Sequence, residues 1–200
     1  MSQRALWRIM GAVAIGAALM ASPPSAMTAR ASEAQPPSLA DITLTGAGGE
    51  PVQLHKIVAG HRLTVVVFFS GTCPCFVVHR ERLGELAREL SPKGIDFVIV
   101  DSERHTAGEV TPATLAGTNL AVLRDEGGRL ARRLGAQYAT ESFVFDTAGQ
   151  LRYRGGIDDQ RKQLGPNARA HLHDALVRLL DKDAPAFVSA KALGCALRLM

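Results

Sequence analysis

Cysteine is scarce in this chain of 200 residues, which contains only Cys73, Cys75 and Cys195, and aromatic residues make up just 5% of it. An odd number of cysteines leaves one sulfur over after a disulfide has formed. Long apolar runs are scarce as well. Residues 9–21, "IMGAVAIGAALMA", form the only long apolar run without a charged residue. That run is short for a membrane span, and no other segment could cross a bilayer. We find no internal repeat and no low-complexity region.

The N-terminal residues have the composition of a secretory signal peptide. Arg4 and Arg8 form a basic segment ahead of the apolar run, and small residues between 22 and 34 offer several cleavage sites. We therefore expect residues 1–31 to be a signal peptide and the mature protein to be periplasmic or secreted. The alternative is an uncleaved anchor at the N-terminus, which would be the chain's only attachment to a membrane.

The charge gives no sign of a nucleic-acid partner. The chain has a formal charge of +4, but Arg4, Arg8 and Arg30 belong to the expected signal peptide. Their removal leaves a net charge of about +1 on the mature protein. We therefore expect no binding to nucleic acid. The roughly 170 remaining residues suffice for one domain with a hydrophobic core. Outside the cytosol the compartment is oxidising, so the cysteines can form disulfides there.

Hydrophobic patterning predicts alternating strands and helices around a central mixed sheet. Continuous apolar runs are typical of strands buried on both faces, and apolar residues at helical spacing are typical of helices. The expected strands are a hairpin at 41–54, then 62–69, 95–101, 120–125 and two short strands within 142–156. The expected helices are 76–90, 127–136 and one that Asn167 caps and that ends at Leu180, with a loop and one short helix in 102–120.

Cys73 and Cys75 lie where an expected buried strand is followed by an expected helix. Backbone N–H groups point at a side chain in that position, and the helix dipole favours the thiolate, which is the reactive form of cysteine. Pro74 suits the first helical position, because its missing N–H would have no partner there anyway. We therefore expect Cys73, close to the helix cap, to be the nucleophile.

Four stretches resemble the redoxin group of the thioredoxin-like superfamily: "VVVFFSGTCPCF", "IDFVIVDSE", "SFVFDTAGQLRYRGGIDD" and the tail "ALGC". That group includes domains of the alkyl hydroperoxide reductase/thiol-specific antioxidant (AhpC/TSA) type and exported thiol–disulfide oxidoreductases. The resemblance covers residues 38–182 and leaves 183–200 as a tail that holds Cys195. It implies a thioredoxin-like α/β fold, with a central mixed β-sheet flanked by helices and an N-terminal β-hairpin extension. It also implies thiol redox chemistry without an organic cofactor.

The sequence departs from the motifs of two enzyme classes with this fold. Thioredoxin-type enzymes carry Cys-x-x-Cys, but Phe76 stands three residues after Cys73, and Thr140 takes the place of the proline that faces the motif. Peroxiredoxins carry a proline seven residues before the reactive cysteine, where this chain has Val66, although Ser70 fits their Thr or Ser three residues before it. We therefore expect thiol–disulfide exchange, with a thiol peroxidase as the alternative.

The identity of the resolving sulfur stays open between Cys75 and Cys195. Side chains two residues apart on a helix point away from each other, so a Cys73–Cys75 disulfide would need non-helical geometry. Strain of that kind makes a disulfide easy to reduce. The expected catalytic residues are therefore Cys73, Cys75 and Cys195. The expected partner is a thiol or disulfide protein, or a peroxide.

A metal site is a competing interpretation of the same region. Cys75 and His79 would share one face of the helix, and Cys73 is nearby in sequence. Thiolates combined with imidazole suit Cu(I) or Zn(II), and exported copper-delivery proteins of the Sco type use the same fold. The alternative function is therefore a copper-binding chaperone with Cys73, Cys75 and His79 as ligands. The main interpretation needs no metal.

Overall fold

The computed structural model of the protein describes residues 38–106, 111–161, 165, 167–181 and 183–199. The expected signal peptide, residues 1–31, lies outside these residues and stays a prediction. Within the described part of the chain, no helix is both long and apolar enough to cross a membrane.

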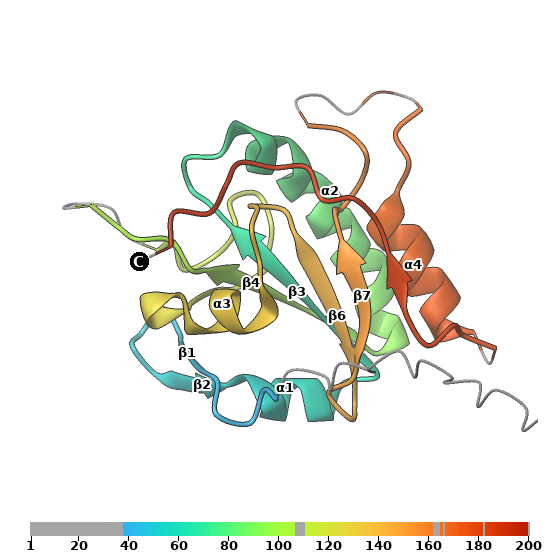
Figure 1. The fold of residues 1–200 in the computed structure, drawn as a ribbon, viewed down its shortest axis with the longest axis horizontal. Coiled ribbons are helices and arrows are strands. Elements are labelled where there is room, and N and C mark those ends of the chain that lie inside the picture. The colour runs from blue at the N-terminus through green and yellow to red at the C-terminus, as the bar shows by residue number, and fades with distance from the viewer. Residues whose placement is uncertain (1–37, 107–110, 162–164, 166, 182, 200) are drawn as a thin grey trace, which may run out of the picture. The chain divides into compact units, whose positions relative to one another are not determined.

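A mixed sheet of eight strands forms the centre of the fold, in the order β2-β1-β5-β4-β3-β6-β7-β8 (Figure 1). The strands are β1 (Thr43–Thr45), β2 (Pro51–Gln53), β3 (Leu63–Phe69), β4 (Ile95–Asp101), β5 (Val122–Arg124), β6 (Ser142–Asp146), β7 (Leu151–Gly155) and β8 (Val188–Ser189). β3 is parallel to β4 and antiparallel to β6. The structure confirms the expected mixed sheet and the N-terminal hairpin β1–β2, while β8, a short strand from the tail, was not predicted.

Helices cover both faces of this sheet. They are α1 (Leu54–Gly60), α2 (Pro74–Leu90), α3 (Arg129–Leu134) and α4 (His171–Leu180), with 3₁₀ turns η1 (Ser91–Lys93) and η2 (Glu126–Gly128). Val65 and Val67 of β3 pack with residues of α2 and α4, whereas Val66 and Phe68 pack with residues of α1 and α3. Side chains alternate between the faces of a strand, so β3 is buried on both sides, as its continuous apolar run predicts.

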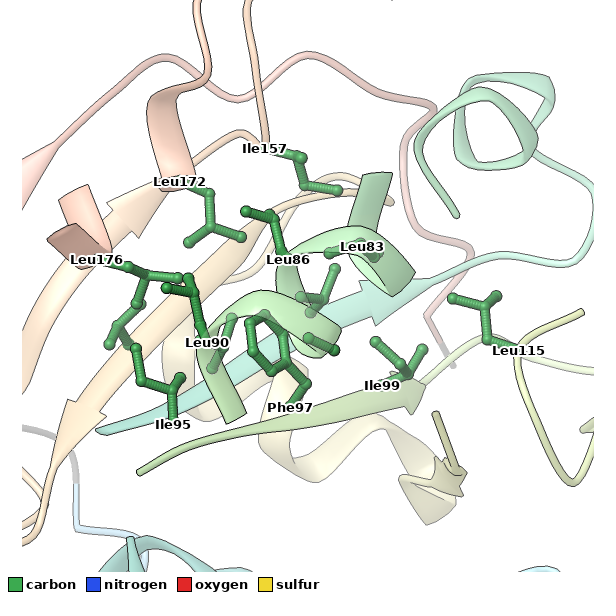
Figure 2. Packing of buried hydrophobic residues seen from close by; sticks show 14 of the residues in the cluster. Leu83, Leu86, Leu90, Ile95, Phe97, Ile99, Leu115, Ile157, Leu172 and Leu176 are labelled. Atoms are coloured by element: carbon green, nitrogen blue, oxygen red, sulfur yellow. The ribbon is translucent and has the colours of Figure 1, made fainter. Parts of the chain in front are cut away.

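The contact between α2 and the sheet fixes the direction of the helix that begins at the cysteines. Leu83, Leu86 and Leu90 of α2 are buried in one cluster, and Figure 2 shows them between β4 and the first turns of α4. Phe97 comes from β4 and Leu172 from α4. This leucine stripe holds α2 against the sheet, and its N-terminus therefore stays at the end of β3.

Two local predictions are wrong. The last helix begins at His171, and Ala170 occupies the N-cap position without a side-chain hydrogen bond, so Asn167 is not the cap. The short helix expected within 102–120 does not occur among the described residues of that segment. Thr114 instead forms an isolated β-bridge with Ala121. α1 was not predicted, because the sequence pattern assigned its first residue, Leu54, to the hairpin.

Candidate active site with three converging cysteines

Cys73 lies at the junction that the sequence predicts, between the end of β3 and the start of α2. It is the N-cap residue of α2, with an extended backbone, and Pro74 occupies the first helical position. The Cys73 amide N–H donates to the Ser70 carbonyl at 3.3 Å, which closes a tight turn after β3. Cys73 is only 1% exposed and Cys75 only 6%. The pair is therefore enclosed rather than presented on the surface.

Cys195, from the opposite end of the chain, completes a cluster of three sulfurs. The Sγ atoms of Cys73, Cys75 and Cys195 all lie within 4.8 Å of one another, and all three residues are free thiols. The structure thus brings together the three cysteines that the sequence proposes as catalytic residues. A sulfur atom of the tail can reach either sulfur of the junction with a small movement.

Backbone hydrogen bonds hold the tail over this site. After β8, which pairs with β7, the Ala139 N–H donates to the Cys195 carbonyl at 2.9 Å. The Leu197 N–H donates to the Gln137 carbonyl at 2.9 Å, and the Thr140 hydroxyl donates to the Leu193 carbonyl at 2.9 Å. Figure 1 shows the tail in red, running from β8 toward the ends of the central strands. The tail therefore binds along residues 137–140 as an added extended segment.

Glu103 connects the C-terminal part of the tail, through Arg198, to the loop before Cys73. This carboxylate is buried and accepts a hydrogen bond from the Ser70 hydroxyl at 2.8 Å. It also accepts one from the Arg198 guanidinium at 3.0 Å and one from the Arg198 N–H at 3.2 Å. A single side chain thus links the tail to the turn that positions the nucleophile. The sequence offered no signal for this link, because its partners are far apart along the chain.

Thr140 and Gly194 mark the place where the tail comes closest to the domain. Thr140 has a φ of 77°, the only positive value for a non-glycine residue in the described part of the chain. A Cβ atom on Gly194 would lie 1.9 Å from the Ala139 carbonyl oxygen. The residue before Cys195 therefore has to be glycine for the tail to lie this close.

Replacing Gly194 with alanine should lift the tail away from the domain and uncover Cys73. We expect the rate of Cys73 alkylation by iodoacetamide at fixed pH to rise at least about tenfold, since a clash with backbone cannot be relieved by a side-chain rotation. The measurement is peptide-level mass spectrometry over time. Gly60→Ala is the matched control, because nothing lies within 4 Å of the added methyl group there. Equal rates in wild type and Gly194→Ala would contradict the covering role of the tail.

Local hydrogen bonds favour ionisation of Cys73. Burial by itself would raise the pKa of Cys73, but a hydrogen bond from the Cys195 thiol and several from backbone N–H groups outweigh it and lower the pKa. Those N–H groups belong to Cys195, Phe76 and Cys75. Cys195 behaves in the opposite way, because burial and the neighbouring Cys73 raise its pKa to about 12. Cys73 is therefore the cysteine of the cluster that ionises more readily, and Cys195 is the one that donates the hydrogen bond.

The pH dependence of Cys73 alkylation follows from this difference. Because the thiolate is the reactive form, the rate should rise with pH around a midpoint below the roughly 8.5 of an ordinary cysteine. Mass spectrometry of the peptide that contains Cys73 gives the rate at each pH. A midpoint at or above the ordinary value would show that burial prevails and that Cys73 is not activated.

His79 lies next to the cluster without contributing a ligand atom to it. Its Nε2 faces Asp158 Oδ1 at 3.0 Å and its Nδ1 faces the Cys75 carbonyl at 2.5 Å, so both ring nitrogens meet acceptors. Burial by itself would lower the pKa of His79, but the hydrogen bonds to Asp158 and to the Cys75 carbonyl raise it. The expected metal ligands Cys73, Cys75 and His79 therefore do not form one cluster in this structure. The third residue that lies beside Cys73 and Cys75 is Cys195.

A cavity of about 370 Å³ opens beside the loop that leads to Cys73. Thr72, Glu103, His105 and Arg198 are among its lining residues, whereas none of the three cysteines lines it. A substrate in this cavity would contact Glu103 and Arg198. The cavity therefore lies next to the turn before Cys73 and to Arg198 of the tail, but not on the sulfurs themselves.

The sheet, the helix order and a cysteine at the strand–helix junction define a thioredoxin-like thiol redox protein. The chain belongs to the Redoxin family, whose model matches residues 31–172. Members of that family act on thiols or peroxides. The match ends before the tail, so Cys195 lies outside the part that the family model describes. No curated protein is similar enough to the chain to count as a match.

Solved structures share the fold of this chain. A hypothetical protein from Sinorhizobium meliloti is 27% identical, with a TM-score of 0.70 over 81% of this chain and 92% of that chain. An uncharacterized conserved protein from Geobacillus kaustophilus is 26% identical, also with a TM-score of 0.70, over 83% and 93%. Peroxiredoxin Q from Xanthomonas campestris is 19% identical, with a TM-score of 0.52 over 74% and 94%, and shares the fold.

Proposed function

We propose that this protein is an exported thiol–disulfide oxidoreductase in which Cys73 attacks the substrate and Cys195 resolves the intermediate. The observation that carries the proposal is the convergence of three free sulfurs within 4.8 Å, with Cys195 hydrogen-bonded to Cys73. The opposite pKa shifts of Cys73 and Cys195 support the division of roles. The composition of residues 1–31 supports export to the periplasm or the cell exterior.

In the forward reaction, the Cys73 thiolate attacks one sulfur of a substrate disulfide, and the other substrate sulfur leaves as a thiolate. A mixed disulfide between Cys73 and the substrate results. The Cys195 thiol transfers its proton to the leaving thiolate and then attacks the Cys73 sulfur. The second substrate sulfur leaves as a thiolate, which takes up a proton from water. The substrate has gained two electrons, and the protein is left with a Cys73–Cys195 disulfide, which a second thiol protein reduces again.

Cys195 is better suited than Cys75 to the resolving role. Cys75 lies within α2, whose backbone the leucine stripe holds against the sheet. Cys195 is on an extended tail that is partly exposed, and the hydrogen bonds of the tail can open one at a time. A disulfide with Cys73 therefore needs movement of the tail only, whereas a Cys73–Cys75 bond would have to distort the first turn of α2.

Disulfide mapping of the oxidised protein tests the proposal. The full chain is oxidised with a small disulfide, digested without reduction and analysed by mass spectrometry. We expect a Cys73–Cys195 link with Cys75 free. A Cys73–Cys75 link would assign resolution to Cys75 instead, and three free thiols would contradict a redox role. Turnover of peroxide without reduction of insulin would assign the thiol peroxidase activity in place of disulfide exchange.

A further inference from the structure

We propose that the reduced protein binds one Cu(I) ion through the sulfurs of Cys73, Cys75 and Cys195. This set differs from the ligands that the sequence suggests, because a cysteine of the tail replaces His79. The inference does not rest on the proposed disulfide exchange. It follows from the geometry of the cluster, from the kind of donor atoms in it and from the burial of those atoms.

The three sulfurs already have almost the spacing that a single ion requires. Metal–thiolate bonds are about 2.3 Å long, so three sulfurs in a plane around one ion lie about 4 Å apart. In this structure the three Sγ atoms lie within 4.8 Å of one another. The backbones of Cys73 and Cys75 are held by the start of α2, and that of Cys195 by the Ala139 N–H. A small inward movement of the side chains would therefore complete a trigonal site.

The donor set selects a soft monovalent ion. No imidazole or carboxylate of a described residue joins the three sulfurs in the cluster. Zn(II) in proteins is almost always four-coordinate, and it would need a further ligand at a place where Cys73 is only 1% exposed. Thiolates select Cu(I), among other soft centres. Burial of Cys73 and Cys75 also keeps water away from such an ion.

The surroundings of the cluster favour the negative charge that three thiolates around Cu(I) would carry. The sulfurs lie at the N-terminus of α2, a helix of 17 residues whose dipole stabilises negative charge. Backbone N–H groups of Cys75 and Phe76 already point at Cys73 Sγ.

Copper binding and the disulfide exclude each other. A Cys73–Cys195 bond would consume two of the three ligands, so only the reduced protein can hold the ion. The bound ion would in turn fix the tail against the domain. Failure to bind Cu(I) would leave the disulfide mapping unaffected, and failure to form the disulfide would leave copper binding unaffected. The two proposals can therefore be tested separately.

The test is an anaerobic titration of the reduced full chain with Cu(I) in competition with bicinchoninate, followed by X-ray absorption at the copper edge. We expect one Cu(I) per chain and three sulfur neighbours without nitrogen. Changing even the groups that orient metal ligands costs about 10- to 100-fold in affinity, so Cys195→Ser should weaken binding more than about 100-fold and leave two sulfur neighbours. Ala196→Ser is the matched control, because it adds a hydroxyl group beside the site and removes no sulfur.

Three results of the copper experiments would overturn the proposal. The first is an equal affinity of wild type and Cys195→Ser for Cu(I), and the second is a nitrogen neighbour in the absorption spectrum. The third is failure of the reduced wild type to compete with bicinchoninate. A parallel titration with Zn²⁺ and a chromophoric zinc indicator tests the choice of metal. Zn²⁺ binding tighter than Cu(I) binding would contradict it.

Discussion

The Cys73→Ser variant should lose the ability to reduce insulin disulfides, with a rate lower than that of wild type by about 10³-fold or more. A hydroxyl group is not ionised near neutral pH and cannot form the mixed disulfide. Removal of an attacking nucleophile in other enzymes costs several powers of ten in rate. The measurement is insulin reduction with a thiol reductant in excess. Circular dichroism and thermal unfolding of the variant confirm that its fold is intact.

Cys75→Ser is the matched control for this experiment. It removes another buried sulfur two residues away, and the proposed reaction does not use that sulfur. We expect this variant to keep most of the wild-type rate. Loss of activity in Cys75→Ser with retention in Cys73→Ser would reverse the roles of the two residues. A Cys195→Ser variant should instead accumulate the mixed disulfide between Cys73 and the substrate.

The position of Cys73 between β3 and α2 could be predicted from the sequence, because it depends on local signals. The continuous apolar run of β3 leads directly to Cys73, and Pro74 begins the helix as its missing N–H predicts. Side chains of β3 alternate between the two faces of the sheet, and the leucine stripe of α2 packs on one of these faces. These features depend on neighbours in the chain, so pattern and spacing were enough to predict them.

The segments that pack over the site, which are the tail with Cys195 and the loop with Asp158, could not be predicted. Their positions depend on contacts between distant parts of the chain. The sequence leaves Cys195 as one of two candidates, and only the structure shows its sulfur beside Cys73. β8 has two residues and carries no strand pattern of its own. His79 lies on a helix face that Asp158 covers, and Asp158 comes from the loop after β7. A helical pattern shows which residues share a face but not which loop packs on it.

Asp158→Asn should lower the free energy of unfolding by about 3 kcal/mol near pH 6, the cost typical of breaking a buried ion pair. The Asp158 carboxylate accepts hydrogen bonds from His79 Nε2 at 3.0 Å and from Arg82 Nη1 at 2.8 Å. The side chains of His79 and Asp158 are 1% and 0% exposed. Removal of the carboxylate charge leaves the cations without their counter-ion. Urea unfolding of wild type and variant measures the difference.

The neighbouring residue offers a matched control for this substitution. Asp159 accepts hydrogen bonds from the Gln160 side chain and from the Arg169 N–H, but it has no cationic partner among the described ion pairs. Asp159→Asn makes the same chemical change in the same loop. We expect it to leave the unfolding midpoint in urea close to that of wild type. Similar losses in the two variants would attribute the effect to the loop rather than to the ion pair.

The stabilisation by the His79–Asp158 pair should decrease both at low pH and at high pH. Burial alone would raise the pKa of Asp158, but its hydrogen bonds with His79 and the Gln160 N–H lower it. Its contribution is therefore complete above the unfolded-state pKa of about 3.9 and is lost as the pH falls through the lowered value. The pKa of His79 is raised, so its contribution is complete below about 6.5 and is lost as the pH rises through the raised value.

The difference in unfolding free energy between wild type and Asp158→Asn should consequently be greatest between about pH 4 and pH 6.5 and smaller on either side. Urea unfolding of both proteins, from below about pH 4 to above about pH 6.5, measures it. A difference that does not fall as the pH rises above about 6.5 would mean that His79 is neutral throughout and binds Asp158 as an ordinary hydrogen-bond donor. The pH profile of stability therefore reports on the charge of the buried His79–Asp158 pair.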